Sequence, residues 1–223
     1  MNVPISGELL LASGSPRRRE LLRSAGLEPQ VRPVDVPESL HPGETAEAMV
    51  RRLSLEKAEQ AIVQFEDGRW VMAADTTVVH QGKILGKPAD EAEALDMLMS
   101  LRQGSHQVIT AVTLIERQSG QSLTCATTTD LVMRDYHRDE VARYVAGGSP
   151  MDKAGGYGIQ DEGFSPVDME RFEGCFTNVM GLPLCTVGRM LDHFHAEGSE
   201  ELIDACYAYH PHKLQPLEGL ADA

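Results

Sequence analysis

The feature that most constrains this chain is residues 8–26, which read ELLLASGSPRRRELLRSAG. The apolar run 9–12 gives way to Ser-Gly-Ser and then to Pro16, which suits the first position of a helix. Ser15 stands where an N-cap residue is expected. The segment therefore predicts a short buried strand that runs directly into a helix.

Three arginines, Arg17, Arg18 and Arg19, occupy the first turn of that predicted helix. The unpaired N–H groups and the macrodipole already favour anions at this end of a helix. A loop of small residues, a helix N-terminus and guanidinium donors together are typical of a phosphate site. The alternative is an exposed basic patch beside an ordinary strand–helix turn.

Charge and composition narrow the class of ligand. The chain has 223 residues, 42% of them hydrophobic, and a net charge of -14, which argues against a nucleic-acid polymer or an anionic membrane as partner. Local positive charge in such an acidic protein suits a small polyanion that arrives with a divalent cation. No basic segment precedes an apolar run at the start and no 18-residue apolar run occurs, so we expect neither a signal peptide nor a membrane span.

The cysteines indicate a reducing, cytoplasmic location. The chain has four, and no two of them form a CxxC pair. This spacing predicts neither a zinc site nor a disulfide framework. The four are Cys125, Cys175, Cys185 and Cys206.

Two charged residues stand at positions that predict burial. Asp75 interrupts the apolar and β-branched run 69–80, and a buried acid is costly unless it is paired, hydrogen-bonded or bound to metal. Lys57 falls on the apolar face of the predicted helix 45–65. The alternatives are an Asp75 satisfied by threonine hydroxyls and backbone, and a Lys57 that reaches the rim.

The remaining segments predict an α/β fold with a mixed sheet. Residues 107–117 and 121–133 form a hairpin, and the glycines in 151–160 permit close backbone approach to a ligand or, alternatively, a flexible loop. The other predicted elements are strands at 83–86 and 175–180 and helices at 90–102, 139–146, 181–196 and 199–209.

Six motifs occur in one order along the chain: LASGSPRRRELL (11–22), LEKA (55–58), AADTTV (73–78), GKP (86–88), DKAGGYGIQ (152–160) and GLPL (181–184). Together, over about residues 8–191, they resemble the Maf family of nucleoside triphosphate pyrophosphatases. The resemblance implies an elongated mixed sheet flanked by helices, two lobes with a cleft as in inosine triphosphatases, and a homodimer. We expect residues 1–198 to form this two-lobed domain and residues 199–223 to form a C-terminal helix and a loose tail.

The resemblance also implies a role for each matching residue. Asp75 falls on the catalytic acid, and Glu38 and Asp75 on the positions expected to hold a divalent metal ion, Mg²⁺ or Mn²⁺. Substrate choice falls on Arg17, Thr76 and Gln160. The phosphate-binding positions match Ser13, Arg17, Arg18, Lys57 and Lys87.

The implied reaction is hydrolysis of a nucleoside triphosphate to the monophosphate and pyrophosphate, a house-cleaning role. Asp75-Thr76 and the run Tyr-Gly-Ile-Gln resemble the subfamily that acts on dTTP and UTP. The resemblance therefore implies dTTP, UTP and modified pyrimidine triphosphates as the substrates. The alternatives are a non-catalytic nucleotide-binding regulator of septum formation and a 7-methyl-GTP pyrophosphatase. The chain departs from the family pattern at Pro37, at Asp161 and in the long loop 164–173.

Overall fold

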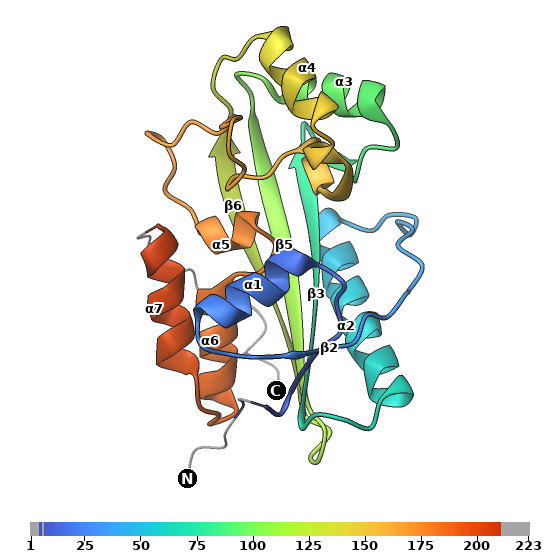
Figure 1. Ribbon diagram of the computed structural model, residues 1–223. Helices are drawn as coiled ribbons and strands as arrows, with labels where there is room; N and C mark the ends of the chain where they lie inside the picture. Colours follow the sequence, from blue (N-terminus) through green and yellow to red (C-terminus); the bar gives the residue numbers. More distant parts are fainter. Residues whose placement is uncertain (1–4, 6, 211–223) are drawn as a thin grey trace.

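The computed structural model describes residue 5 and residues 7–210 (Figure 1). One mixed sheet forms its centre, with strand order β2-β1-β3-β5-β6 and with β4 paired to β3. The pairs β1–β2 and β1–β3 are parallel and the others antiparallel. The strands are β1 (Leu9–Leu11), β2 (Gln30–Val31), β3 (Trp70–His80), β4 (Lys83–Leu85), β5 (Ser105–Glu116) and β6 (Ser122–Val132). This sheet, with its flanking helices, confirms the predicted fold class.

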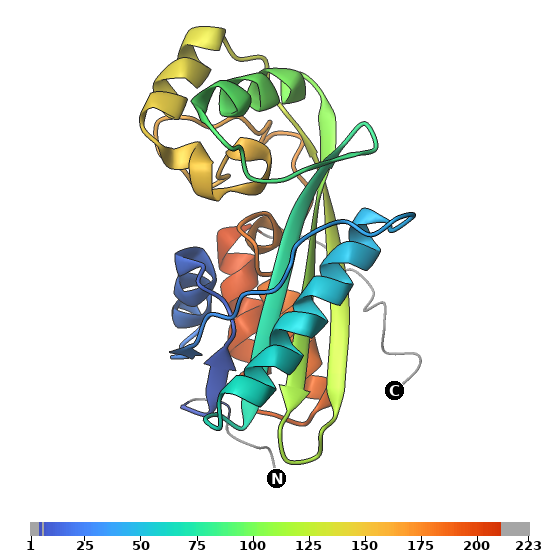
Figure 2. The same ribbon diagram turned by 90° about the vertical axis from the view of Figure 1, so that its right-hand side faces the viewer.

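Helices cover both faces of the sheet (Figure 2). The helix α2 (Ala46–Gln64) packs along one face, where Met49, Val50 and Leu53 are buried. Its Thr45 N-cap accepts a hydrogen bond from the Ala48 amide at 3.2 Å. The opposite face carries α1 (Pro16–Ser24), α5 (Phe176–Val179), α6 (Leu184–His193) and α7 (Ser199–Tyr209).

The molecule is elongated because β3, β5 and β6 each have 11 or 12 residues, about 36–41 Å at the usual rise per residue. At one end of these strands lie α3 (Glu91–Leu101) and α4 (Arg138–Ala146), with the short helices η1 (Ser149–Asp152) and η2 (Ala154–Gly156). At the other end lie α1, α6 and α7 (Figure 1). The two groups of helices form two lobes on one continuous sheet.

The β1–α1 turn forms largely as predicted. Pro16 begins α1, and Ser15 has the extended backbone of an N-cap, but its side chain makes no capping hydrogen bond. Instead the Ser15 amide donates to the Ser13 hydroxyl at 3.3 Å. The turn is therefore fixed by Ser13 rather than by the hydroxyl of the cap residue.

The predicted strand at 175–180 is wrong, because this segment forms α5. Its composition favours a strand, yet tertiary contacts hold it as a helical turn. The buried Asn178 amide donates to the Val108 carbonyl at 3.0 Å and to the Thr129 hydroxyl at 2.9 Å, which anchors the turn against β5 and β6. The adjoining helix α6 begins after Pro183 and ends at His193, earlier than expected.

The C-terminal segment is described only in part. The predicted helix at 199–209 is present as α7, and its Leu202 and Cys206 are fully buried. The loose tail expected from residue 211 onward lies outside the described residues. Among the described helices, none has both the length and the apolar character needed to cross a membrane.

Candidate active site

A cavity of about 830 Å³ is bordered by the β1–α1 turn, β3, the loop before α2 and residues 152–160. Every site residue predicted from the sequence lines it. Five cations and three carboxylates face this space, so its local charge is opposite to that of the whole chain. The predicted residues are Ser13, Arg17, Arg18, Glu38, Lys57, Asp75, Thr76, Lys87 and Gln160.

Lys57 bridges two carboxylates at the wall of the cavity. Its Nζ lies 2.6 Å from Asp75 Oδ1 and 2.6 Å from Glu38 Oε1. The Lys57 and Asp75 side chains are each 11% exposed, whereas that of Glu38 is 59% exposed. Lys57 on α2 and Asp75 in β3 thus form an ion pair. The pairing offsets the desolvation free energy that either charge would cost if it were buried alone.

The cavity perturbs both carboxylates in opposite directions. Burial raises the pKa of Asp75 above its ordinary value, although the positive charges of Lys57 and Arg18 oppose this effect. Burial also acts to raise the pKa of Glu38, but the hydrogen bond and charge of Lys57 outweigh it and hold that pKa below its usual value. Two neighbouring carboxyl groups with separated pKa values are typical of catalytic sites.

Arg18 ties the wall of the cavity together. Its Nε donates to the Gly181 carbonyl at 2.8 Å, and Nη1 donates to the Ala74 carbonyl at 2.7 Å and to Ser13 Oγ at 3.0 Å. Its Nη2 donates to Thr76 Oγ1 at 3.0 Å. Because most of its donors are used within the protein, Arg18 fixes the positions of Ser13 and Thr76 and has little capacity left for a ligand.

Arg17, Lys87 and Lys153 supply further positive charge along the cavity. Arg17 Nη1 donates to Asp152 Oδ2 at 2.6 Å, and Lys153 Nζ donates to Asp152 Oδ1 at 3.0 Å. Lys87, just after β4, is exposed. Arg19 does not line the cavity, as expected from the turn of about 100° between successive helical residues.

Gln160 is held by its neighbour Asp161. The amide nitrogen of Gln160 donates to Asp161 Oδ1 at 3.0 Å, while Asp161 Oδ2 accepts from the Tyr144 and Ser149 hydroxyls, each at 2.6 Å. A carboxylate only accepts hydrogen bonds, so the nitrogen of the amide must face it. The remaining oxygen, Gln160 Oε1, is buried and has no hydrogen-bond partner among the described residues.

Three residues that shape this end of the cavity had no role predicted from the sequence, namely Asp152, Lys153 and Tyr157. Asp152 and Lys153 belong to the motif at 152–160, but nothing in their spacing indicates that Asp152 pairs with both Lys153 and Arg17. The one sign in the sequence that this end of the cavity is unusual is Asp161, which departs from the family pattern. A Cβ at Gly158 would collide with the Asp161 carboxylate, so this placement of the acid requires a glycine at position 158.

The loop 164–173, which also departs from the family pattern, is anchored to the rest of the domain. Phe164 and Phe172 are buried, and the Phe164 ring packs 4.7 Å from the Tyr144 ring, centroid to centroid. Tyr144 in turn binds Asp161. The loop therefore supports the residues that orient Gln160.

The family model of Maf-like proteins matches residues 8–194. The chain belongs to the Maf-like protein family. A dTTP/UTP pyrophosphatase of Geobacter sulfurreducens is 46% identical over 81% of this chain and 93% of its own length. One from Chromobacterium violaceum is 44% identical over 85% of this chain and 96% of its own length, and one from Dehalococcoides mccartyi is 44% identical over 82% and 81%.

Among solved structures, the Ham1 protein of Staphylococcus aureus is similar at a TM-score of 0.43 and 16% identity, covering 74% of this chain and 80% of that one. A protein from Vibrio cholerae reaches a TM-score of 0.37 at 11% identity, over 94% of this chain and 96% of that one. Both similarities are too weak to add to the family assignment.

Proposed function

We propose that this chain hydrolyses nucleoside triphosphates, dTTP and UTP foremost, to the monophosphate and pyrophosphate. The observation that carries the proposal is the Asp75–Lys57–Glu38 arrangement at the wall of a cavity rich in cations. The names of the relatives that match over most of this chain support the substrate. A binding protein without catalysis has no need of a buried carboxylate beside its phosphate-binding cations.

Asp75 is the proposed general base. Its raised pKa brings it closer to neutrality, where a base accepts a proton from water most effectively, and the neighbouring Lys57 ammonium opposes this rise. Lys57 keeps Oδ1 in place by its hydrogen bond. The Oδ2 atom makes no hydrogen bond among the described residues, so it is the oxygen we assign either to the attacking water or to a metal ion that activates it.

The phosphate chain is assigned to the cations. Arg17, Lys87 and Lys153 line the cavity, and Arg18 holds its wall rather than acting as the main phosphate ligand. Positive groups fixed in advance stabilise the negative charge that shifts to the leaving pyrophosphate, and they do so without rearranging. Lys153 is not added to the phosphate-binding set, because its Nζ already donates to the Ser149 carbonyl and hydroxyl and to Asp152.

A divalent metal ion, Mg²⁺ or Mn²⁺, fits this donor set. Glu38 and Asp75 would hold it, because each uses one carboxylate oxygen on Lys57 and such ions favour carboxylate and phosphate oxygens. When bound, the ion neutralises phosphate charge and polarises the phosphoryl group. Pro37 offers no carboxylate, so this chain supplies one loop acid where a pair was expected.

Base choice is assigned to Gln160. Its free Oε1 matches the N3–H donor of uracil and thymine, whereas N3 of cytosine is an acceptor. A buried acceptor without a partner costs about 1–3 kcal/mol, which such a base would remove. Arg17 and Thr76 remain proposed contributors to this choice, Thr76 through its hydrogen bond from Arg18.

The test is pyrophosphate release from UTP, dTTP, CTP and 7-methyl-GTP, with Mg²⁺ and with chelator. We expect UTP and dTTP to be hydrolysed comparably and faster than the other two, and only with metal. Asp75→Asn should bind UTP but release no pyrophosphate, and Asp96→Asn, at an exposed acid of α3, is the matched control. Binding of UTP without release by the wild-type protein would support the regulator instead, and preference for 7-methyl-GTP would support the other alternative.

The homodimer and the cytoplasmic location also remain proposals, supported by family membership and by the cysteine pattern. Sedimentation at micromolar concentration tests the dimer, with a mass near twice 24.4 kDa as the expected result.

A further inference from the structure

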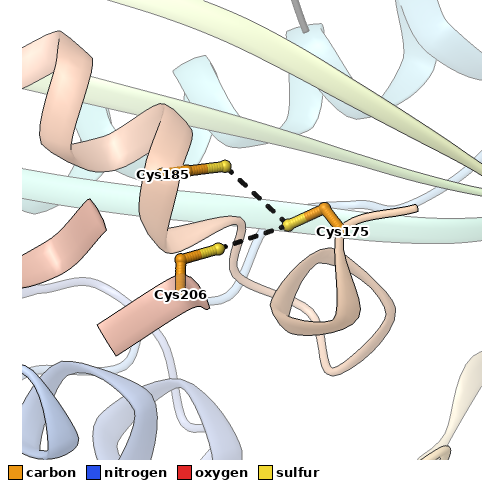
Figure 3. Close-up of side chains that lie close together, drawn as sticks. All are labelled: Cys175, Cys185 and Cys206. Atoms are coloured by element: carbon orange, nitrogen blue, oxygen red, sulfur yellow. Dashed lines mark hydrogen bonds between the residues drawn. The ribbon is translucent and has the colours of Figure 1, made fainter. Parts of the chain in front are cut away.

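Three of the four cysteines converge although their spacing in the sequence indicated no site (Figure 3). Cys175 precedes α5, Cys185 lies in the first turn of α6, and Cys206 lies on α7. The Cys175 sulfur is 3.9 Å from that of Cys185 and 3.6 Å from that of Cys206, and all three lie within 4.8 Å of one another. The fourth, Cys125, lies on β6 outside this thiol cluster.

These separations suit a metal ion at the centre of the three sulfurs. A metal–sulfur bond is about 2.3 Å long, so three sulfurs arranged in a plane around one ion stand about 4.0 Å apart. The thiols of the cluster are already close to that spacing without moving their helices. All three residues are buried, so water does not compete for the position.

A hydroxyl next to the cluster can donate to a metal-bound sulfur. Thr177 Oγ1 lies 3.1 Å from Cys206 Sγ and 3.3 Å from Cys175 Sγ, and it accepts a hydrogen bond from the Leu184 amide at 3.1 Å. Since its lone pair serves that amide, its proton can be donated to a sulfur. Cys185 stands at the N-terminal end of a ten-residue helix, an end whose dipole suits a negatively charged metal–thiolate group.

We propose that Cys175, Cys185 and Cys206 bind one thiophilic d10 metal ion, Cu(I) in preference to Zn²⁺. Soft thiolate ligands favour Cu(I), and a protein zinc site of the structural kind takes four ligands. The cluster found among the described residues contains three sulfurs and no histidine or carboxylate. The ion would join α5, α6 and α7, which closes the C-terminal helix onto the domain.

Uptake of the ion is an exchange of protons for metal. Each thiol that becomes a ligand loses its S–H proton to solvent and forms one copper–sulfur bond, and the copper stays in the +1 state. Binding therefore strengthens as the pH rises.

The experiment measures transfer of Cu(I) from a chromophoric Cu(I) chelator to the reduced full-length protein without oxygen. We expect one ion per chain and a higher melting temperature with copper, because a ligand that binds only the folded state stabilises it. Cys175→Ser should lower the affinity by at least about 100-fold, beyond the 10–100-fold typical of residues that only touch a ligand. Cys125→Ser is the matched control and should bind as the wild type does.

Circular dichroism confirms that each variant is folded, and Cys185→Ser replaces Cys175→Ser if the latter is not. Absence of copper transfer to the wild-type protein would overturn the proposal. So would an equal loss of affinity in Cys125→Ser, or binding of Zn²⁺ without binding of Cu(I). None of these results depends on the proposed hydrolysis.

Discussion

The sharpest prediction concerns Asp161→Asn, which should reverse the base preference. The new side chain has an oxygen and an N–H₂ group in the place of two acceptors. Its oxygen is expected to stay with the Tyr144 and Ser149 hydroxyls, which both approach Oδ2 at 2.6 Å. Its N–H₂ group then faces Gln160, so the Gln160 amide must turn over to present its oxygen. The Gln160 nitrogen would then face the base.

The size of the effect follows from the hydrogen bonds exchanged. In the wild type, Gln160 Oε1 suits uracil N3–H and opposes cytosine N3, a mismatch of about 1–3 kcal/mol. Because 1.4 kcal/mol is tenfold, we expect UTP to be preferred over CTP by about tenfold or more. Turning the amide removes this preference and creates the opposite one, so the ratio should change on the order of 100-fold.

The assay is competition between UTP and CTP in one reaction, with UMP and CMP separated by chromatography. The product ratio gives the ratio of the two kcat/KM values and does not depend on how much enzyme is active. Asp161→Ala should leave the amide free to turn and bring the ratio close to one, and Glu162→Gln, at the exposed neighbouring acid, should leave it unchanged. An Asp161→Asn enzyme that kept the wild-type ratio, while Gln160→Ala lost it, would refute the reasoning.

Other predictions follow from the wall of the cavity. Asp75→Asn should lower kcat for UTP by at least about 100-fold with little change in nucleotide binding, measured by pyrophosphate release and calorimetry. Arg18→Ala should lower both kcat/KM and thermal stability, because the Ala74 and Gly181 carbonyls lose the hydrogen bonds that Arg18 donates to them. Arg19→Ala should leave kcat/KM nearly unchanged, and equal losses would indicate a diffuse basic patch. The base must be ionised, so activity should be lost as the pH falls below the raised pKa of Asp75. Because Lys57 lowers that pKa, Lys57→Met should move the acidic limb of the pH profile to higher pH. A pH profile of kcat/KM measures both, and an unshifted limb in Lys57→Met would contradict the pairing.

The centre of the site was predictable because burial can be inferred from periodicity. Lys57 at an inward helical position and Asp75 in an apolar strand are each costly alone, so the sequence predicts that each needs a partner. Their pairing at 2.6 Å supplies it. The sheet was predictable for the same reason, since alternating and continuous apolar runs specify β3, β5 and β6 directly.

Interactions between segments distant in the sequence were not predictable in this way. The carbonyls that accept from Arg18 belong to Ala74 and Gly181, which are 56 and 163 residues away. Every residue has the same backbone carbonyl, so the sequence does not indicate which ones Arg18 will reach. The helical turn at Phe176–Val179 depends on what Asn178 finds in β5 and β6, against its own composition. The thiol cluster brings together three separate helical segments, so spacing along the chain contains no trace of it.

The residues that local pattern identifies carry the chemical groups of the site, whereas the residues that only the fold brings close set the pKa of those groups. Local pattern identifies the carboxylate and the lysine, but the pKa of Asp75 depends on how deeply β3 is covered and on where Arg18 and Glu38 come to lie. Arg18 reaches both β3 and the segment before α6, so it connects the strand that carries Asp75 to the opposite border of the cavity at Gly181. The chemistry at Asp75 is therefore a property of the closed fold, and a variant that loosens Arg18 should alter the acidic limb of the pH profile even though Asp75 itself is unchanged.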